Sequence, residues 1–145
     1  MANEKIAEIL NRHVANWNVL FVKLHNYHWY VKGPNFFTLH EKFEELYNEA
    51  ATYIDDLAER LLTLNGEPVA TMKQFLEVAT IKEADGERDA KEMVEKIVED
   101  LMTMDEELKA DIITLEDDQA TQDMLIGIRA SVEKHLWMFQ SFLNK

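Results

Sequence analysis

Helix-breaking residues are scarce in this chain, and they separate long amphipathic stretches. The 145 residues include four glycines and two prolines, and both residue types oppose helix continuation. Between these breaks, apolar residues recur at three- and four-residue steps, which is the pattern of an amphipathic helix. The pattern predicts an all-α fold with long helices at residues 4–30, 36–64 and 87–114, and a fourth that ends near Leu143.

Capping residues mark where these helices begin and end. Asn3 precedes the first helix, and Asp118 or Thr121 precedes the fourth. Oxygens of such side chains accept hydrogen bonds from the free N–H groups of a first helical turn. The second helix is closed by Asn65-Gly66, because these residues tolerate the left-handed backbone that ends many helices.

The longest predicted connection joins the second and third long helices. Within it, Thr71 is expected to cap a short helix at residues 72–79. Four long helices with one long connection describe a ferritin-like four-helix bundle. The length of the chain is that of one domain, so we expect a single domain over residues 1–145.

The composition excludes several classes of protein. The chain has no cysteine, so disulfides, thiolate metal sites and cysteine nucleophiles are excluded. No window holds eighteen uncharged apolar residues, and the first ten residues do not resemble a signal peptide, so we expect a cytoplasmic protein without a membrane span. The formal charge of −13 argues against nucleic-acid binding and suits a protein that attracts cations.

Histidines and carboxylates are concentrated between Lys23 and Leu62. Imidazole and carboxylate together form the ligand set of zinc and of non-haem iron or manganese. The residues within each of two pairs are four positions apart, and the step of eleven positions from one pair to the next is almost a whole number of helical turns. The pairs therefore lie along one stripe of a helix, and they are His40 with Glu44 and Asp55 with Glu59.

The two ends of this stripe are too far apart to share a metal within one chain. His40 and Asp55 are fifteen residues apart, which is a rise of about 22 Å along a helix. Metal–ligand bonds are about 2 Å long. If both pairs bind one centre, a second, antiparallel copy of the helix must bring its Asp55 and Glu59 to the first copy's His40 and Glu44. Such an arrangement is a two-fold dimer interface.

The same residues carry a resemblance to a known family. The run HNYHWYVKGPNFFTLHEKFEELY, followed by DDLAERLL, resembles the Dps family of mini-ferritins. The resemblance extends over the whole chain in length and helix order, and the family also has a short helix before its third long helix. It implies that the ferroxidase ligands, contributed by two subunits, are His28, His40, Glu44, Asp55 and Glu59. Many members have Asp where this chain has Glu44.

Two observations bear on the histidines themselves. A lone histidine on an apolar stripe is often a core residue, but His28 and His40 flank one turn and are followed by carboxylates in phase. Ferritins with a metal site inside the bundle use a Glu-x-x-His motif. Three residues before His40 is Phe37, and three residues before His135 is Val132, so neither histidine completes that motif. Its absence favours the intersubunit site.

Further acidic and aromatic residues have two readings each. Trp29 and His25 adjoin the site and are candidates for supporting it, although ordinary packing is the alternative. An acidic cluster lies at the start of the fourth helix and comprises Asp117, Asp118 and Asp123. These residues either cap the helix and form a solvated face, or line a three-fold cation pore. A second set is read as a solvated face or as a mineral-nucleating inner surface; it comprises Glu41, Glu45 and Glu49.

The resemblance also implies an activity. A Dps-like protein would form a hollow homo-dodecamer, bind Fe(II) at the dimer interface and oxidise it to Fe(III), preferably with hydrogen peroxide. It would store a ferric mineral and so protect against oxidative damage. DNA compaction is the family's second activity, but it needs a basic tail, and this chain ends at Lys145 directly after its last helix. A non-catalytic shell is the third alternative, and the intact ligand set counts against it.

Overall fold

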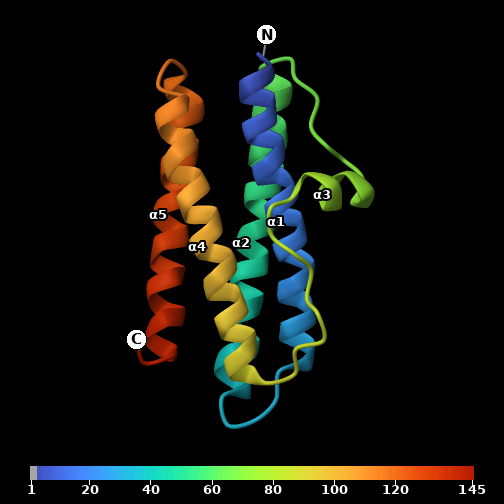
Figure 1. Ribbon diagram of the computed structural model, residues 1–145, viewed down its shortest axis with the longest axis vertical. Helices are drawn as coiled ribbons and strands as arrows, with labels where there is room; N and C mark the ends of the chain where they lie inside the picture. The colour runs from blue at the N-terminus through green and yellow to red at the C-terminus, as the bar shows by residue number, and fades with distance from the viewer. Residues whose placement is uncertain (1–2) are drawn as a thin grey trace. The chain divides into compact units, whose positions relative to one another are not determined.

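Five α-helices make up the protein, and no strand occurs between residues 3 and 145, which are the residues described by the computed structural model (Figure 1). The all-α prediction is therefore confirmed. None of these helices is both long and apolar enough to cross a membrane. In chain order the helices are α1 (Glu4–Tyr30), α2 (Phe36–Thr63), α3 (Met72–Val78), α4 (Ala90–Thr114) and α5 (Gln119–Phe142).

Most of the predicted caps are present. The Asn3 side chain accepts a hydrogen bond from the Ile6 N–H at 2.8 Å, and Thr71 accepts one from the Gln74 N–H at 3.1 Å. Asp118, and not Thr121, caps α5, because its Oδ1 accepts from the Thr121 N–H at 3.2 Å. Beyond α2, Asn65 has a φ of 63°, the left-handed geometry expected there.

The predicted start of the third long helix is wrong by three residues. Residues 87–89 precede α4 instead of forming its first turn. Asp89 caps the helix, since its Oδ2 accepts a hydrogen bond from the Glu92 N–H at 3.1 Å. The side chain of Glu87 is 7% exposed and is directed inward, where it accepts hydrogen bonds from Tyr27 and from the Asp85 N–H.

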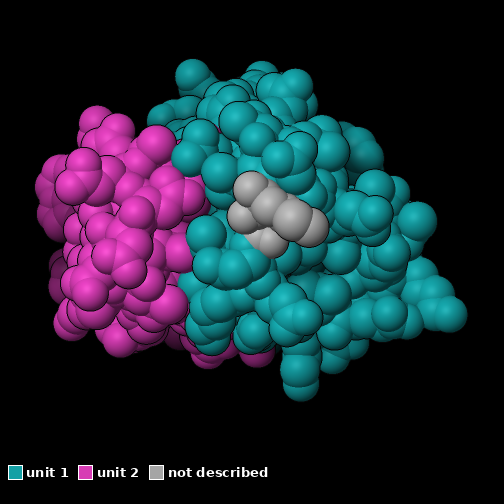
Figure 2. Space-filling view, turned by 90° about the horizontal axis from the view of Figure 1, so that it is seen from above, with its two compact units in different colours: residues 1–93 teal, residues 94–145 magenta. Residues whose placement is uncertain are grey.

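The described chain divides into two compact units, residues 1–93 and 94–145, which Figure 2 shows in separate colours. In the first unit, α1 and α2 run antiparallel and are joined by a short connection (Figure 1). Trp17 in the middle of α1 faces Tyr53, with ring centroids 4.9 Å apart, and Phe21, one turn closer to the connection, faces Tyr47 at 5.9 Å. The buried apolar residues of these two helices include Leu20, Leu24, Phe43, Leu46, Leu57 and Leu61.

A row of polar side chains on α1 holds the long connection between α2 and α4. The Asn11 amide donates to the Glu67 carbonyl and accepts from the Val69 N–H. Further along α1, Asn16 is fully buried and bonds in both directions with Thr80, through that residue's hydroxyl and N–H. Because these contacts satisfy backbone groups that lie outside any helix, the connection follows a defined path along α1.

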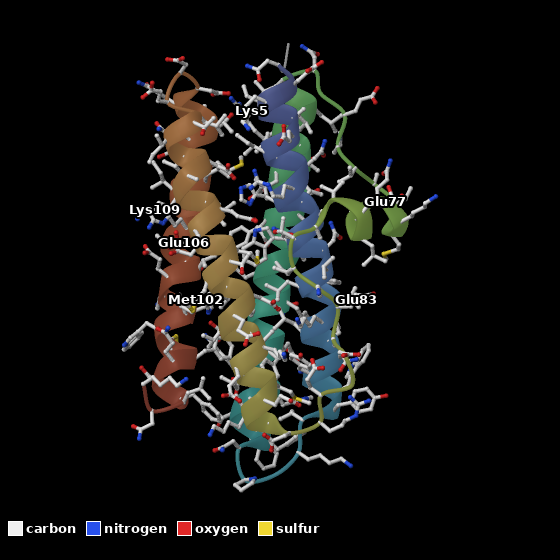
Figure 3. The ribbon with its side chains drawn as sticks, in the orientation of Figure 1. Lys5, Glu77, Glu83, Met102, Glu106 and Lys109 are labelled. Carbon is white, nitrogen blue, oxygen red and sulfur yellow. The ribbon has the colours of Figure 1, made fainter. Side chains whose placement is uncertain are left out.

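In the second unit, residues 115–118 turn the chain from α4 into α5. Arg129 Nε donates to Asp105 Oδ1 at 3.1 Å, and Gln122 Nε2 donates to the Ile112 carbonyl at 2.8 Å. These two contacts link α4 to α5 at separate points. The exposed residues of α4 include apolar, acidic and basic side chains, as Figure 3 shows for Met102, Glu106 and Lys109.

Candidate metal half-site

Two histidines meet where α1 ends and α2 begins. His28 lies in the last turn of α1, and His40 lies in the second turn of α2. The chain reverses between them through Gly33, whose φ of 105° suits glycine. Their rings stack with centroids 3.7 Å apart and an interplanar angle of 11°. The predicted pair is therefore brought together within one chain.

Reciprocal hydrogen bonds orient the two rings. His28 Nδ1 lies 2.6 Å from the His40 carbonyl oxygen, and His40 Nδ1 lies 2.8 Å from the His28 carbonyl oxygen. A carbonyl can only accept, so both Nδ1 atoms carry protons and donate. In the neutral rings, each Nε2 then holds a lone pair and can bind a metal ion.

One of these hydrogen bonds is possible because α1 ends close to His28. The carbonyls in the last turn of a helix have no intrahelical partner, and α1 ends at Tyr30, two residues after His28. The His28 carbonyl is thus free to accept from His40. The carboxyl-terminal end of a helix also carries a partial negative charge, which favours a cation nearby.

Glu44 adds a carboxylate to the histidine pair. It lies one turn after His40 on α2, and its Oε1 is 3.7 Å from His28 Nε2. The His28 ring is nearly buried, whereas about half of the Glu44 side chain is exposed. No three His, Asp or Glu side chains in the described part of the chain converge closely enough to hold a metal ion. We therefore describe His28, His40 and Glu44 as the histidine half-site.

The predicted carboxylate ligands lie at the other end of α2. Asp55 and Glu59 are both exposed, and neither side chain forms a hydrogen bond or ion pair with residues 3–145. Since α2 is one unbroken helix from Phe36 to Thr63, the separation of about 22 Å from His40 stands. The structure brings His28, His40 and Glu44 together and leaves Asp55 and Glu59 apart from them.

An aromatic group packs beside the histidine half-site. The Tyr47 ring stacks on His25 with centroids 3.7 Å apart and meets the His28 ring edge-on at 5.3 Å. Burial, with a smaller contribution from the Glu44 carboxylate, raises the pKa of Tyr47, so its phenol stays protonated. Trp29 is 68% exposed, and its ring centroid lies 5.4 Å from that of His25. Tyr47 was not among the predicted site residues, although it follows Glu44 by three residues and so shares its helix face.

The other acidic candidates have partners of their own or lie in solvent. Both oxygens of Asp118 accept from Thr121, while Asp117 and Asp123 are exposed. In the second set, Glu41 is exposed, Glu45 pairs with Lys42 at 3.6 Å, and Glu49 accepts a hydrogen bond from the Tyr53 hydroxyl. The pore and nucleation roles of these residues remain predictions.

Similarity to known proteins is extensive. Residues 7–145 match the family model of the ferritin-like domain. General stress protein 20U of Bacillus subtilis is 57% identical over 144 residues, which cover 98% of this chain and 99% of that protein. The DNA protection during starvation protein 2 of Bacillus anthracis is 55% identical over 145 residues, with 99% of each chain covered.

Solved structures show the same fold. The crystal structure of Dps from Staphylococcus aureus superposes with a TM-score of 0.95 at 48% identity, covering 99% of this chain and 98% of that one. The ferritin-like prediction, with its short helix between the second and third long helices, is thereby confirmed. A Listeria innocua Dps mutant with two histidines replaced by glycine, spaced as His28 and His40 are, has a TM-score of 0.94 at 42% identity, covering 100% and 97% of the two chains.

Proposed function

Because this chain belongs to the Dps family of ferritin-like proteins, we propose that it is an iron-storage ferroxidase. In this proposal, residues 1–145 act as one ferritin-like domain. Fe(II) is the substrate, and His28, His40 and Glu44 of one chain bind it together with Asp55 and Glu59 of a second. The observation that supports the proposal is the reciprocal pair of Nδ1 hydrogen bonds, because each Nε2 of the neutral rings could then bind a metal ion.

The site is complete only when two chains pair. An antiparallel second copy of α2 would place its Asp55 and Glu59 opposite the first copy's histidine half-site, and the two-fold axis would generate two such sites. The family resemblance extends this pairing to a hollow dodecamer. Light scattering should then give about twelve times the mass of one chain, 17.0 kDa.

The ligand set suits iron oxidation. Imidazole nitrogen permits ferrous binding, whereas hard carboxylate oxygens favour the ferric product. With hydrogen peroxide as the oxidant, two Fe(II) ions each lose one electron, the O–O bond breaks, and two protons complete two water molecules. Two-electron reduction avoids the hydroxyl radical that a single Fe(II) ion would generate. Storage of the ferric product in the shell would protect the cell from oxidative damage.

Iron titration of the apo-protein tests this function. Fe(II) is added anaerobically, and ferric absorbance is followed after addition of either hydrogen peroxide or air. We expect about two Fe(II) oxidised per peroxide, faster than with air, and little hydroxyl radical in a spin trap compared with a protein-free control. Oxidation no faster than in that control would support a non-catalytic shell and contradict the proposal.

DNA compaction is the second candidate, since several relatives are named for DNA protection. Twelve chains at −13 each would carry a formal charge of about −156, so repulsion from phosphate should dominate. We expect no gel shift at neutral pH and low salt without added divalent cations. A shift that weakens with salt would reveal a localised basic surface and favour this second function.

A further inference from the structure

A buried carboxylate fastens the last turn of α1. Tyr27 is fully buried, and its hydroxyl donates a hydrogen bond to Glu87 Oε1. The other oxygen, Oε2, accepts from the Asp85 N–H at 2.8 Å. Gly86 lies between these two residues with a φ of 78°, which allows the tight turn. Glu87 thus joins α1 to the segment that leads into α4.

Neighbouring contacts hold the same stretch of α1. One turn before Tyr27, the nearly buried Lys23 donates through Nζ to the Lys82 carbonyl at 2.9 Å. Three residues after Tyr27, the Tyr30 ring lies beneath the Arg88 guanidinium, whose Cζ is 3.7 Å from the ring centroid. Three side chains in succession along α1 are therefore attached to residues 82–88. Burying a carboxylate is unfavourable unless it is hydrogen-bonded, and the proposed chemistry does not use Glu87.

The histidine half-site depends on the turn that is held in this way. His28 directly follows Tyr27, and its carbonyl accepts the Nδ1–H of His40. A shift of this turn would move the His28 ring and would also remove the acceptor that orients His40. We propose that Tyr27 and Glu87 are positioning residues that set the two imidazoles for metal binding. This inference rests on the proposed function.

Cobalt binding tests the inference without iron turnover. Co(II) is titrated into the assembled apo-protein, and its visible absorption reports both affinity and coordination geometry. Partners that orient metal-binding histidines typically change metal affinity by 10–100-fold. Tyr27 and Glu87 act one step further out, so Tyr27→Phe and Glu87→Gln should each weaken Co(II) binding by about 3- to 10-fold and alter the spectrum.

Tyr53→Phe is the matched control. It removes another tyrosine-to-glutamate hydrogen bond, from Tyr53 to Glu49, at a part-buried position within α2. This variant should keep the affinity and the spectrum of the unsubstituted protein even if its melting temperature falls. The double variant Tyr27→Phe/Glu87→Gln should bind Co(II) no more weakly than the weaker single variant, because the two residues act through one contact.

Three outcomes would overturn the inference. Lower melting temperatures with unchanged Co(II) affinity and spectra would show that the contact serves stability alone. Equal losses of affinity in Tyr53→Phe would show a general effect of destabilisation. If Tyr27→Phe fails to assemble, the Co(II) affinity and spectrum of the milder variant Glu87→Gln test the inference. An absence of Co(II) binding by the unsubstituted protein would instead contradict the metal site itself, and the inference with it.

Discussion

The two ends of α2 are prepared for metal binding to very different degrees. At the first end, the His28 and His40 rings stack, and each ring donates a hydrogen bond to the other residue's backbone carbonyl. The Glu44 carboxylate lies 3.7 Å from His28 Nε2. At the second end, Asp55 and Glu59 are exposed and have no side-chain partner among residues 3–145. The chain thus brings His28, His40 and Glu44 together and leaves Asp55 and Glu59 apart from them.

This difference suggests where each half obtains its geometry. Like charges four residues apart on a helix destabilise it by about 0.2–0.5 kcal/mol, and no side-chain contact of Asp55 or Glu59 with residues 3–145 offsets this. In the proposed site, the oriented imidazoles would set the position of the metal, and the exposed carboxylates of a second chain would complete its ligands. Under the proposed function, Asp55 and Glu59 would serve the site of a partner chain rather than a site in their own chain.

Complementation between two damaged chains should give the largest effect. One variant carries His28→Ala and His40→Ala, and the other carries Asp55→Ala and Glu59→Ala. Each alone should lose nearly all peroxide-dependent iron oxidation, because every shared site lacks one end. When the two are co-expressed and pair at random, half of the dimers are mixed and half of their sites are whole. About a quarter of the activity should then return.

Assembly of each variant must be checked first, because alanine at a dimer interface can prevent pairing. Light scattering and mass spectrometry of the mixed product establish that both chains are present in one particle. A site built from one chain would gain nothing from mixing. Properly mixed dodecamers without recovered activity would therefore refute the shared site.

Local spacing in the sequence was enough to predict the fold and to place His40 and Glu44 on one helix face; the role of these residues remains a prediction. Helix lengths followed from three- and four-residue periodicity, and His40 with Glu44 followed from a shared helix face. Contacts between distant segments were beyond this reasoning. The reciprocal histidine bonds depend on how the 31–35 turn closes. The start of α4 was misplaced because Glu87 suits a first helical turn, whereas a distant partner, Tyr27, draws its side chain inward.

Folding stability should distinguish the two ends by a smaller amount. His40→Ala removes a ring stack and the hydrogen bond to the His28 carbonyl, so the free energy of unfolding should fall by about 1–2 kcal/mol. Asp55→Asn/Glu59→Gln removes charge repulsion and should change stability by less than about 0.5 kcal/mol, in the stabilising direction. Urea titrations of apo-protein at one fixed concentration measure both. A loss of more than 1 kcal/mol in the carboxylate variant would mean that its side chains have partners after all.

The smallest expected effect is on the pH dependence of stability. It should distinguish the buried carboxylate of Glu87 from the exposed carboxylates. Burial of Glu87 acts to raise its pKa, but hydrogen bonds from Tyr27 and from backbone N–H groups, together with nearby Lys23, lower the pKa below its usual value.

A lowered folded-state pKa stabilises the protein at pH values above the unfolded-state pKa, which is about 4.3 for glutamate. That stabilisation is lost as the pH falls through the folded-state pKa. The difference in unfolding free energy between the unsubstituted protein and Glu87→Gln should therefore be constant from about pH 8 to 5 and become smaller below about pH 4. Glu77→Gln, at an exposed position on α3 (Figure 3), removes the same kind of carboxylate and should show a small difference throughout. A difference for Glu87→Gln that widens in acid would show that the carboxylate is strained in place rather than held by its partners.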